Sequence, residues 1–488
     1  MMPVPSLPEN QPDINITPDR ISKNSLWIFL GLLSSAAISL VTILFLTRYL
    51  GPEKFGLYSV ALSLTSLFIP LSNLGLDLHL TRTVSANPKS LTRELAHTLS
   101  AKTILSAIVW ILIILTASLL KYSTVLIGYV ALFGISMLVG SMAQSFIASI
   151  RAIRKMRYES ISIFTGKMAI LFGVLFMIII KANITMIILA NLLGMIVLFM
   201  TSLYFLKLQI GHLDIYFSLK GIKSRLESAF PFGLASIFVV IYYRIDTVML
   251  SKMVDINEVG IYNSAYNIVL ASMILSSPIA VSLFPALSAI YSKNKNEADH
   301  IFNKGVSFSV LLGLPLGIGT ALMAKPIIEI AYGVNFVSSV PLLLIMSGTI
   351  PLLFVTHIFG SSIGAVGFQK RVAWVTAING SFNVLLNLIL IPHYGTRGAA
   401  IATLLTEFLS MIQLIIASKG IFEKHVLKDL LKICLCCILG TAGFILTIEY
   451  TGPWLAAGIF ALVYAGFVFA LKLVPIDMVK NILASSRE

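Results

Sequence analysis

Charged residues are scarce in this chain of 488 residues. Asp, Glu, Lys and Arg make up 11% of the sequence, and 57% of the residues are hydrophobic. A soluble globular domain carries roughly 25% charged residues. A soluble chain of this length would need far more polar surface than this one has. The composition therefore excludes a soluble protein and predicts an all-α polytopic membrane protein.

Cysteine is also scarce, and several catalytic patterns are missing. The three cysteines, Cys434, Cys436 and Cys437, lie in one apolar span, and their C-x-C-C spacing does not converge on a metal as zinc ligands do. No phosphate-binding G-x-x-x-x-G-K-[ST] motif is present. A glycosyltransferase would need acidic metal ligands in an outside loop, and the longest predicted outside loops offer only Asp255 with Glu258, or Glu329 alone. These absences predict no metal, no cofactor and no catalytic residues, and they favour a secondary transporter over an enzyme.

Long apolar runs, by contrast, are abundant. A segment of about 20 apolar residues spans a bilayer core of roughly 30 Å. About fourteen spans are expected, at residues 25–47, 55–80, 99–120, 124–150, 160–180, 184–206, 230–251, 259–290, 304–324, 338–365, 372–391, 398–418, 430–448 and 453–473.

The cations are unevenly distributed between the loops. With the N-terminus placed inside, the inside segments carry 26 Lys and Arg and the outside segments carry 7. This bias predicts that both termini lie in the cytoplasm and that the chain resides in the cytoplasmic membrane. The same bias accounts for most of the net charge of +14, because cations on the inside segments orient the spans and contact membrane lipids. We therefore expect no nucleic-acid partner.

The spans divide into two groups of six with additions at both ends. The proline-rich N-terminal segment reads as a disordered tail, and the segment between the groups reads as an interfacial amphipathic helix. The expected divisions are a cytoplasmic tail (1–22), an N-lobe with spans one to six (23–206), a linker helix (207–229), a C-lobe with spans seven to twelve (230–419), and two accessory spans with a cytoplasmic tail (420–488).

An internal repeat relates the two groups. The sequence GLYSVA at residues 56–61 matches GIYNSA at residues 260–265, at an offset of 204. A cation stands eight positions before each glycine, Arg48 in one copy and Lys252 in the other. Because each half has six spans, both halves start on the same side. We therefore expect a parallel repeat, related by an axis along the membrane normal.

Two opposite charges lie inside the seventh span. Arg244 and Asp246 each cost roughly 2.5–3.5 kcal/mol at a helix centre, so each is a functional hypothesis. Positions two apart do not face each other on a helix, so the two charges cannot pair. Arg244 is expected to line a cavity between the lobes and bind substrate, or to anchor at the outer interface. Asp246, on the other face beside Tyr242, is expected to be structural, holding a tyrosine hydroxyl or a cation from a neighbouring span.

Further polar side chains mark spans eleven and twelve. Asn379, Asn383 and Asn387 recur at intervals of four and form one stripe, suited either to substrate or ion contacts or to hydrogen bonds between helices. Glu407 lies near the centre of span twelve, where a carboxylate must be protonated, paired or hydrated. Glu407 is the candidate for ion coupling, and a fixed ion pair or hydrogen bond is the alternative.

Three stretches resemble the polysaccharide flippase family of the multidrug/oligosaccharidyl-lipid/polysaccharide exporter superfamily. They are TRYLGPEKFGLYSVALSL at 47–64, PFGL…YYRIDTVMLS…VGIYNSAYNIV within 231–269, and NVLLNLILIPHYGTRGAAIATLLTE at 383–407. The resemblance implies two six-helix lobes around a cavity that opens alternately to each side. It implies a polyprenyl-pyrophosphate-linked oligosaccharide as cargo, for cell-surface polysaccharide or glycoconjugate synthesis. Glycan polymerases or glycosyltransferases are the partners it suggests. In this family cavity arginines hold the pyrophosphate, which favours Arg244 and then Arg48.

Two other functions stay open. A multidrug and toxin extrusion-type cation antiporter would favour acidic cavity residues, but the spans of the first lobe have only Asp77, with Arg48, Arg82 and Lys167 nearby. That balance favours an anionic cargo. The third possible function is a non-transporting scaffold of a glycan-assembly complex. In a scaffold, the charges embedded in the spans would have no role.

Overall fold

The computed structural model describes residues 18–211, 216–217, 222–423, 427–471 and 473. Every regular element in this part of the chain is helical. The α-helices are α1 (Pro18–Asn73), α2 (Leu76–Ala86), α3 (Leu91–Leu119), α4 (Thr124–Ala152), α5 (Met156–Ile179), α6 (Ile184–Ile210), α7 (Ile222–Met253), α8 (Ile256–Ile290), α9 (Lys295–Leu322), α10 (Ala324–Ala331), α11 (Val340–Ser347), α12 (Thr349–Ala365), α13 (Gln369–Tyr394), α14 (Thr396–Ala417) and α15 (Leu427–Ala470). Two 3₁₀ helices are η1 (Pro88–Ser90) and η2 (Val334–Ser339).

The helices are long and apolar enough to make this a multi-pass membrane protein. Among the described residues, ten helices could cross a membrane, or eleven if η2–α11 and α12, bent by 45°, form one span. The helices α1 and α15 are each divided into two arms, at Gly51 and Gly452. The prediction of an all-α polytopic membrane protein is therefore confirmed. The count of fourteen spans stays a prediction.

The second predicted span is not one continuous helix. The helix α1 ends at Asn73, the backbone turns through the left-handed residues Leu74 (φ 43°) and Gly75 (φ 81°), and α2 begins at Leu76. The Asn73 side chain accepts a hydrogen bond from the Asp77 backbone N–H at 3.2 Å. The break places Asp77 in the first turn of α2. Apolar content alone did not predict this break, because the residues on both sides of Leu74 and Gly75 also have a helical pattern.

The structure also differs from the predicted tail and linker. Residues 18–22 begin α1, and the rest of the predicted tail lies outside the described residues. In the predicted linker, the described residues 207–210 end α6 and 222–229 begin α7. Ala229 is buried against Leu76 and Ala101 of the N-lobe. At Ala229 the start of α7 thus packs against the N-lobe, and α7 continues without a break into the seventh span.

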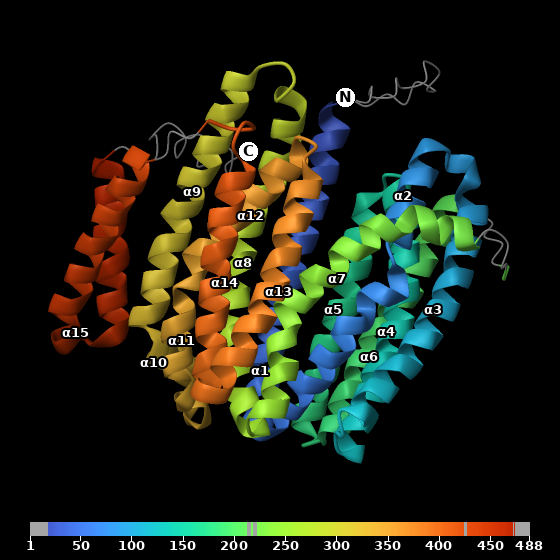
Figure 1. The fold of residues 1–488 in the computed structure, drawn as a ribbon, viewed down its shortest axis with the longest axis horizontal. Helices are drawn as coiled ribbons and strands as arrows, with labels where there is room; N and C mark the ends of the chain where they lie inside the picture. The colour runs from blue at the N-terminus through green and yellow to red at the C-terminus, as the bar shows by residue number, and fades with distance from the viewer. Residues whose placement is uncertain (1–17, 212–215, 218–221, 424–426, 472, 474–488) are drawn as a thin grey trace.

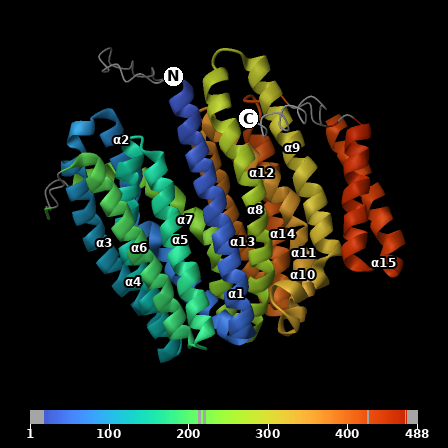
Figure 2. The same ribbon diagram turned by 180° about the vertical axis from the view of Figure 1, so that it is seen from behind.

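The helices gather into two groups. One group holds α2–α6 and the other holds α8–α14, with α15 packed outside on α9 (Figures 1 and 2). The helix α1 lies between the groups and packs on α5 on one side and α8 on the other.

The helix α7 crosses from one group to the other. At its start, Arg225 donates from Nε to Glu94 of α3 at 3.1 Å. Gly233 lies so close to α1 that an added Cβ would be 2.7 Å from the Leu74 backbone. Beyond that contact, α7 packs along α13 of the C-lobe, and it runs diagonally in Figure 1. A movement of the two lobes must therefore involve α7.

Candidate functional site

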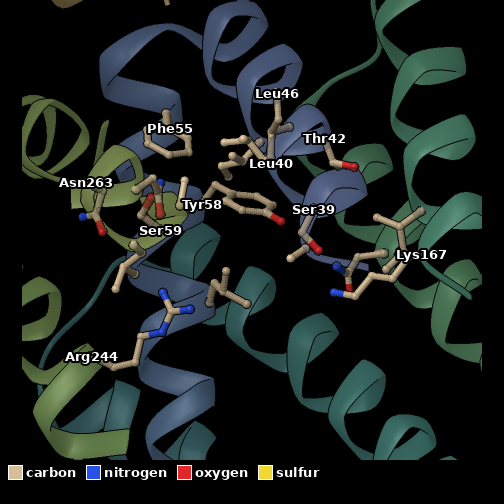
Figure 3. Close-up of a pocket in the computed structure, with 18 of the residues that line it drawn as sticks. Ser39, Leu40, Thr42, Leu46, Phe55, Tyr58, Ser59, Lys167, Arg244 and Asn263 are labelled. Carbon is tan, nitrogen blue, oxygen red and sulfur yellow. The ribbon is translucent and has the colours of Figure 1, made fainter. Parts of the chain in front are cut away.

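A cavity of about 490 Å³ lies between the two lobes. Both arms of α1, together with α5, α6, α7 and α8, supply its walls. Arg244 enters from α7 of the C-lobe, and Lys167 enters from α5 of the N-lobe. Figure 3 shows the two cationic ends pointing into the space between them, with the Tyr58 ring beside it. The cavity lies within the range of pockets that hold small ligands.

The two cations are not neutralised by the protein. Arg244 and Lys167 are both half-buried, and neither makes an ion pair with an Asp or Glu in the described part of the chain. A guanidinium matches the geometry of phosphate oxygens, and an ammonium adds a compact positive charge. Two uncompensated cations in a half-buried cavity attract an anion. Arg244, which was expected to line a cavity between the lobes, lies on the wall of this one, and its binding of substrate stays a prediction.

Neutral polar groups complete the cavity wall. Asn191 of α6 and Asn267 of α8 line it, as does Asn263, whose Oδ1 accepts from Thr247 Oγ1 at 3.0 Å. The sequence placed Lys167 among the N-lobe cations that favour an anionic cargo, but neither Lys167 nor these amides was predicted to be a ligand. Lys167 was visible as a cation inside an apolar span, but its approach to Arg244 depends on how the lobes pack.

The lobes are closed against each other at the end of the cavity where α1 turns at Gly51. Gly56 of α1 faces Gly260 of α8, and these are the glycines of the internal repeat. An added Cβ on Gly56 would lie 2.1 Å from the Ile256 carbonyl oxygen, and one on Gly260 would lie 1.9 Å from that of Pro52. The two helices can approach this closely only because neither residue has a side chain.

The cations of the repeat flank this glycine contact. Lys252 Nζ donates to the Leu120 carbonyl of the N-lobe at 2.5 Å and lies 3.4 Å from the Tyr122 ring centre. Arg48 Nη1 donates to the Ile330 carbonyl of the C-lobe at 3.5 Å. Each repeat therefore sends a cation to a carbonyl of the opposite lobe. Arg48, predicted to bind substrate, is exposed here and does not line the cavity.

Asp246 points away from this cavity, into the C-lobe. It is 3% exposed and accepts three hydrogen bonds, from Tyr262 at 2.9 Å, Thr403 at 3.1 Å and Asn387 at 2.6 Å. The tyrosine that reaches it belongs to α8, whereas Tyr242 donates to Glu407 instead. A tyrosine hydroxyl from a neighbouring helix thus reaches Asp246, and the structural role expected of Asp246 stays a prediction.

The asparagine stripe of α13 divides between two places. Asn387 Nδ2 donates to Asp246 and, at 3.0 Å, to Asn383 Oδ1, so these two amides belong to the Asp246 network. Asn379 lines a separate cavity within the C-lobe. The structure therefore places none of the three asparagines on the wall shared by Arg244 and Lys167.

Glu407 lies in that C-lobe cavity, which has a volume of about 360 Å³. The carboxylate is 3% exposed and accepts a hydrogen bond from the Tyr242 hydroxyl. Tyr243, Asn379 and Ser410 also line the cavity. One acidic group beside two aromatic rings can hold a proton or a small cation, but it cannot attract an anion.

The described residues contain no cluster of three or more His, Cys, Asp or Glu that could hold a metal ion. The side-chain oxygens around Asp246 come closest to such a cluster. There, Asn387 Oδ1 is buried without a hydrogen-bond partner beside the carboxylate. A single carboxylate with amide and hydroxyl oxygens suits a hard cation rather than a transition metal.

Comparison with known proteins gives several curated relatives. A segment of 166 residues is 30% identical to the "Probable low-salt glycan biosynthesis flippase Agl15" of Haloferax volcanii, covering 34% of this chain and 35% of that protein. The "Probable flippase AglR" of the same organism is 30% identical over 35% of this chain and 37% of its own length. The chain thus spans about a third of the length of these relatives. The "Putative O-antigen transporter" of Shigella flexneri is 22% identical over 78% of this chain and 94% of its own.

Solved structures share the fold. The "Lipid II flippase MurJ, inward closed conformation" superimposes with a TM-score of 0.73 at 18% identity, covering 93% of this chain and 99% of that one. An inward-facing multidrug resistance MATE family transporter of the MOP superfamily gives 0.61 at 15% identity, over 79% of this chain and 95% of its own. The sequence pattern of the family described as "Polysaccharide biosynthesis protein" matches residues 21–291, more than half of the chain. The resemblance expected from the sequence is confirmed, and the chain belongs to the polysaccharide biosynthesis protein family.

Proposed function

We propose that this protein is a flippase that moves a polyprenyl-pyrophosphate-linked oligosaccharide across the cytoplasmic membrane by alternating access. The observation that carries the proposal is the meeting of Arg244 and Lys167, one from each lobe, in a single cavity. A pyrophosphate is the anionic part of such a lipid. Because its two cationic ligands come from different lobes, its binding is coupled to the relative position of the lobes. The names of the Haloferax and Shigella relatives agree with this cargo.

The closed end provides the second element of the mechanism. We assign the Gly56–Gly260 contact and the two cation-to-carbonyl bonds to an outer gate, closed in this arrangement. With the termini in the cytoplasm, as the positive-inside bias predicts, this gate lies on the outer side. Loading then takes place on the cytoplasmic side, where glycosyltransferases would deliver the lipid. A glycan polymerase would receive it on the other side.

The test is reconstituted flipping. Purified protein in liposomes is given a fluorescent oligosaccharide-pyrophosphoryl polyprenol, and its appearance in the opposite leaflet is measured. Arg244→Gln and Lys167→Gln should each reduce the flipping rate about 10- to 100-fold, because each removes a charge-assisted hydrogen bond of about 1.5–3 kcal/mol. The matched controls Arg397→Gln and Lys207→Gln change exposed cations away from the cavity and should flip at the unaltered rate.

Export of a cation is the alternative function, and the C-lobe cavity is the observation that favours it. Glu407, Tyr242 and Tyr243 present an acid and two aromatic rings, a combination that binds organic cations. Liposomes that export a lipophilic cation such as tetraphenylphosphonium, and that do not flip the pyrophosphate lipid, would establish the antiporter instead. Activity toward neither compound would favour a scaffold in a glycan-assembly complex.

A further inference from the structure

A second polar cavity lies inside the N-lobe, directly beside the Arg244–Lys167 cavity. Its volume is about 260 Å³, and α1, α2, α3, α4 and α6 form its walls. Leu62, Asn191 and Met195 line both cavities, so the two adjoin along this wall. A ligand that fills the first cavity can therefore extend a neighbouring group into the second.

One ion pair lies in this side cavity, and it is fully satisfied by the protein. Lys102 is completely buried, and its Nζ donates to Asp77 Oδ1 at 2.9 Å, to Asp77 Oδ2 at 2.8 Å and to the Ser141 carbonyl at 2.5 Å. Ser145 Oγ donates to Asp77 Oδ1 at 2.8 Å. Asp77 and Lys102 are the only charged residues among those that line the cavity, so its net charge is zero. An isolated cation or anion would find no uncompensated partner here.

Other polar groups of the wall still have hydrogen-bonding capacity. Ser141 lines the cavity and is more than nine-tenths buried, and its Oγ has no hydrogen-bond partner among the described residues. Buried hydroxyls are almost always paired, so this one marks a place for a ligand atom or a water. The Gln144 amide, from the next turn of α4, lines the same wall and makes no hydrogen bond to the described residues. Asn191, at the junction of the two cavities, also offers an amide.

A neutral, hydroxyl-rich group fits these properties. A sugar ring uses its hydroxyls as both donors and acceptors, which amide and serine side chains match. The volume of the cavity lies below the range of drug-sized pockets, so it suits one ring rather than a chain of rings. Phe133 adds an apolar surface for the C–H face of a ring.

We propose that this N-lobe cavity binds the first sugar of the lipid-linked glycan as a neutral monosaccharide ring. The proposal rests on the proposed function, because the pyrophosphate attached to that sugar would lie between Arg244 and Lys167. Ser141 and Gln144 then determine which sugar is accepted, and the Asp77–Lys102 pair holds α2, α3 and α4 in place around it. The cavity therefore supplies specificity, whereas the two cations supply affinity for every pyrophosphate lipid.

The experiment compares binding of two kinds of lipid to the full-length protein in nanodiscs. One is polyprenyl pyrophosphate without a sugar, and the others carry a single glucose, galactose or N-acetylglucosamine on the pyrophosphate. We expect at least one sugar to raise the affinity about 3- to 10-fold for each hydrogen bond gained. Gln144→Leu and Ser141→Ala should remove that gain, so that the sugar-bearing lipid binds like the bare one. Arg244→Gln should weaken all of the lipids alike.

The outcomes separate the two proposals. If bare and sugar-bearing lipids bind equally and Arg244→Gln weakens both, the sugar site is wrong and the flippase proposal stands. If the gain survives in both Gln144→Leu and Ser141→Ala, the sugar binds elsewhere and the assignment of this cavity is wrong. If no pyrophosphate lipid binds at all, both proposals fail. A circular dichroism melt shows whether each variant is folded. If Gln144→Leu loses the fold, Ser141→Ala, the smaller change, still tests the cavity.

Discussion

At the scale of single residues, α7 sends two charges only two positions apart into different surroundings. Arg244 faces the cavity between the lobes with no acidic partner among the described residues, whereas Asp246 is enclosed in the C-lobe by three hydrogen-bond donors. The spacing alone predicts that the two cannot pair. One charge is therefore available to a ligand, and the other is used within the protein.

The first prediction concerns Asp246→Asn. An asparagine presents one acceptor and one donor group, so at least one of Tyr262, Thr403 and Asn387 loses its acceptor. Leaving a buried polar group unsatisfied costs about 1–3 kcal/mol. We expect a lower midpoint of thermal unfolding in detergent, while Glu53→Gln, at an exposed carboxylate, leaves the midpoint unchanged. A variant as stable as the parent that no longer transports would show that Asp246 acts in coupling, for example by holding a cation.

The second prediction concerns Glu407→Gln. A glutamine can still accept from Tyr242, but it can neither take up and release a proton nor balance a cation. We expect the variant to fold and to bind the lipid-linked glycan, while its flipping no longer responds to an imposed ion gradient. The control Glu449→Gln alters an exposed carboxylate of α15 and should keep the gradient response. Gradient-driven flipping at the full rate in Glu407→Gln would eliminate the coupling role.

At the scale of elements, the closed end depends on two helices that touch at glycine. The sequence already identified Gly56 and Gly260 as equivalent positions of a repeat, but not that they face each other. Their contact follows from the packing of α1 on α8 across the two lobes. A repeat within one chain fixes which residues are alike, and tertiary packing decides which of them meet.

The third prediction is that Gly260→Ala prevents closure of this end. Its methyl group would lie 1.9 Å from the Pro52 carbonyl oxygen, far inside van der Waals contact, so the helices must separate. A cysteine at Asn267, with the three native cysteines replaced by alanine, reports on the cavity. It should react faster with an impermeant thiol reagent added on the side of the gate, and flipping should fall at least about 10-fold.

Gly128→Ala is the matched control, because no atom lies within 4 Å of the added methyl group. It should leave both the labelling rate and the flipping rate unchanged, because the added methyl group meets no atom. Alanine is also about 1 kcal/mol more favourable than glycine within a helix. Equal labelling of the Asn267 cysteine in Gly260→Ala and in Gly128→Ala would refute the gate.

The sequence predicted the helical elements well and their breaks and side-chain partners poorly. Apolar runs located nearly every helix because length and hydropathy are local properties. The break at Leu74–Gly75 was missed. Lys102 is one of the 26 cations assigned to the inside segments, whereas the structure buries it against Asp77. The partner of Lys102 comes from another helix, and so does the Tyr262 hydroxyl that donates to Asp246. Contacts between helices cannot be predicted from the periodicity of one segment.

At the scale of the whole molecule, the two lobes are joined by α1 and α7 and are closed against each other at one end. Lys252 of the C-lobe reaches the N-lobe at Leu120, and Arg48 of the N-lobe reaches the C-lobe at Ile330. These positions are equivalent in the repeat, so the gate is held by two related contacts. If the lobes move as units, both contacts stabilise the same closed state.

The last prediction follows from that shared state. Lys252→Gln and Arg48→Gln should each shift the equilibrium toward the open gate, by about 2- to 5-fold for an exposed charge-assisted contact of roughly 0.5–1 kcal/mol. Because the two contacts share no partner residue and act on one two-state equilibrium, their free energies should add. The double variant should therefore multiply the labelling rate of the Asn267 cysteine by the product of the two single effects. Lys207→Gln, an exposed cation outside the gate, should have no effect on that rate. A double variant no faster than either single variant would mean that the two contacts do not close the same gate, and the rigid-body account of the lobes would then be wrong.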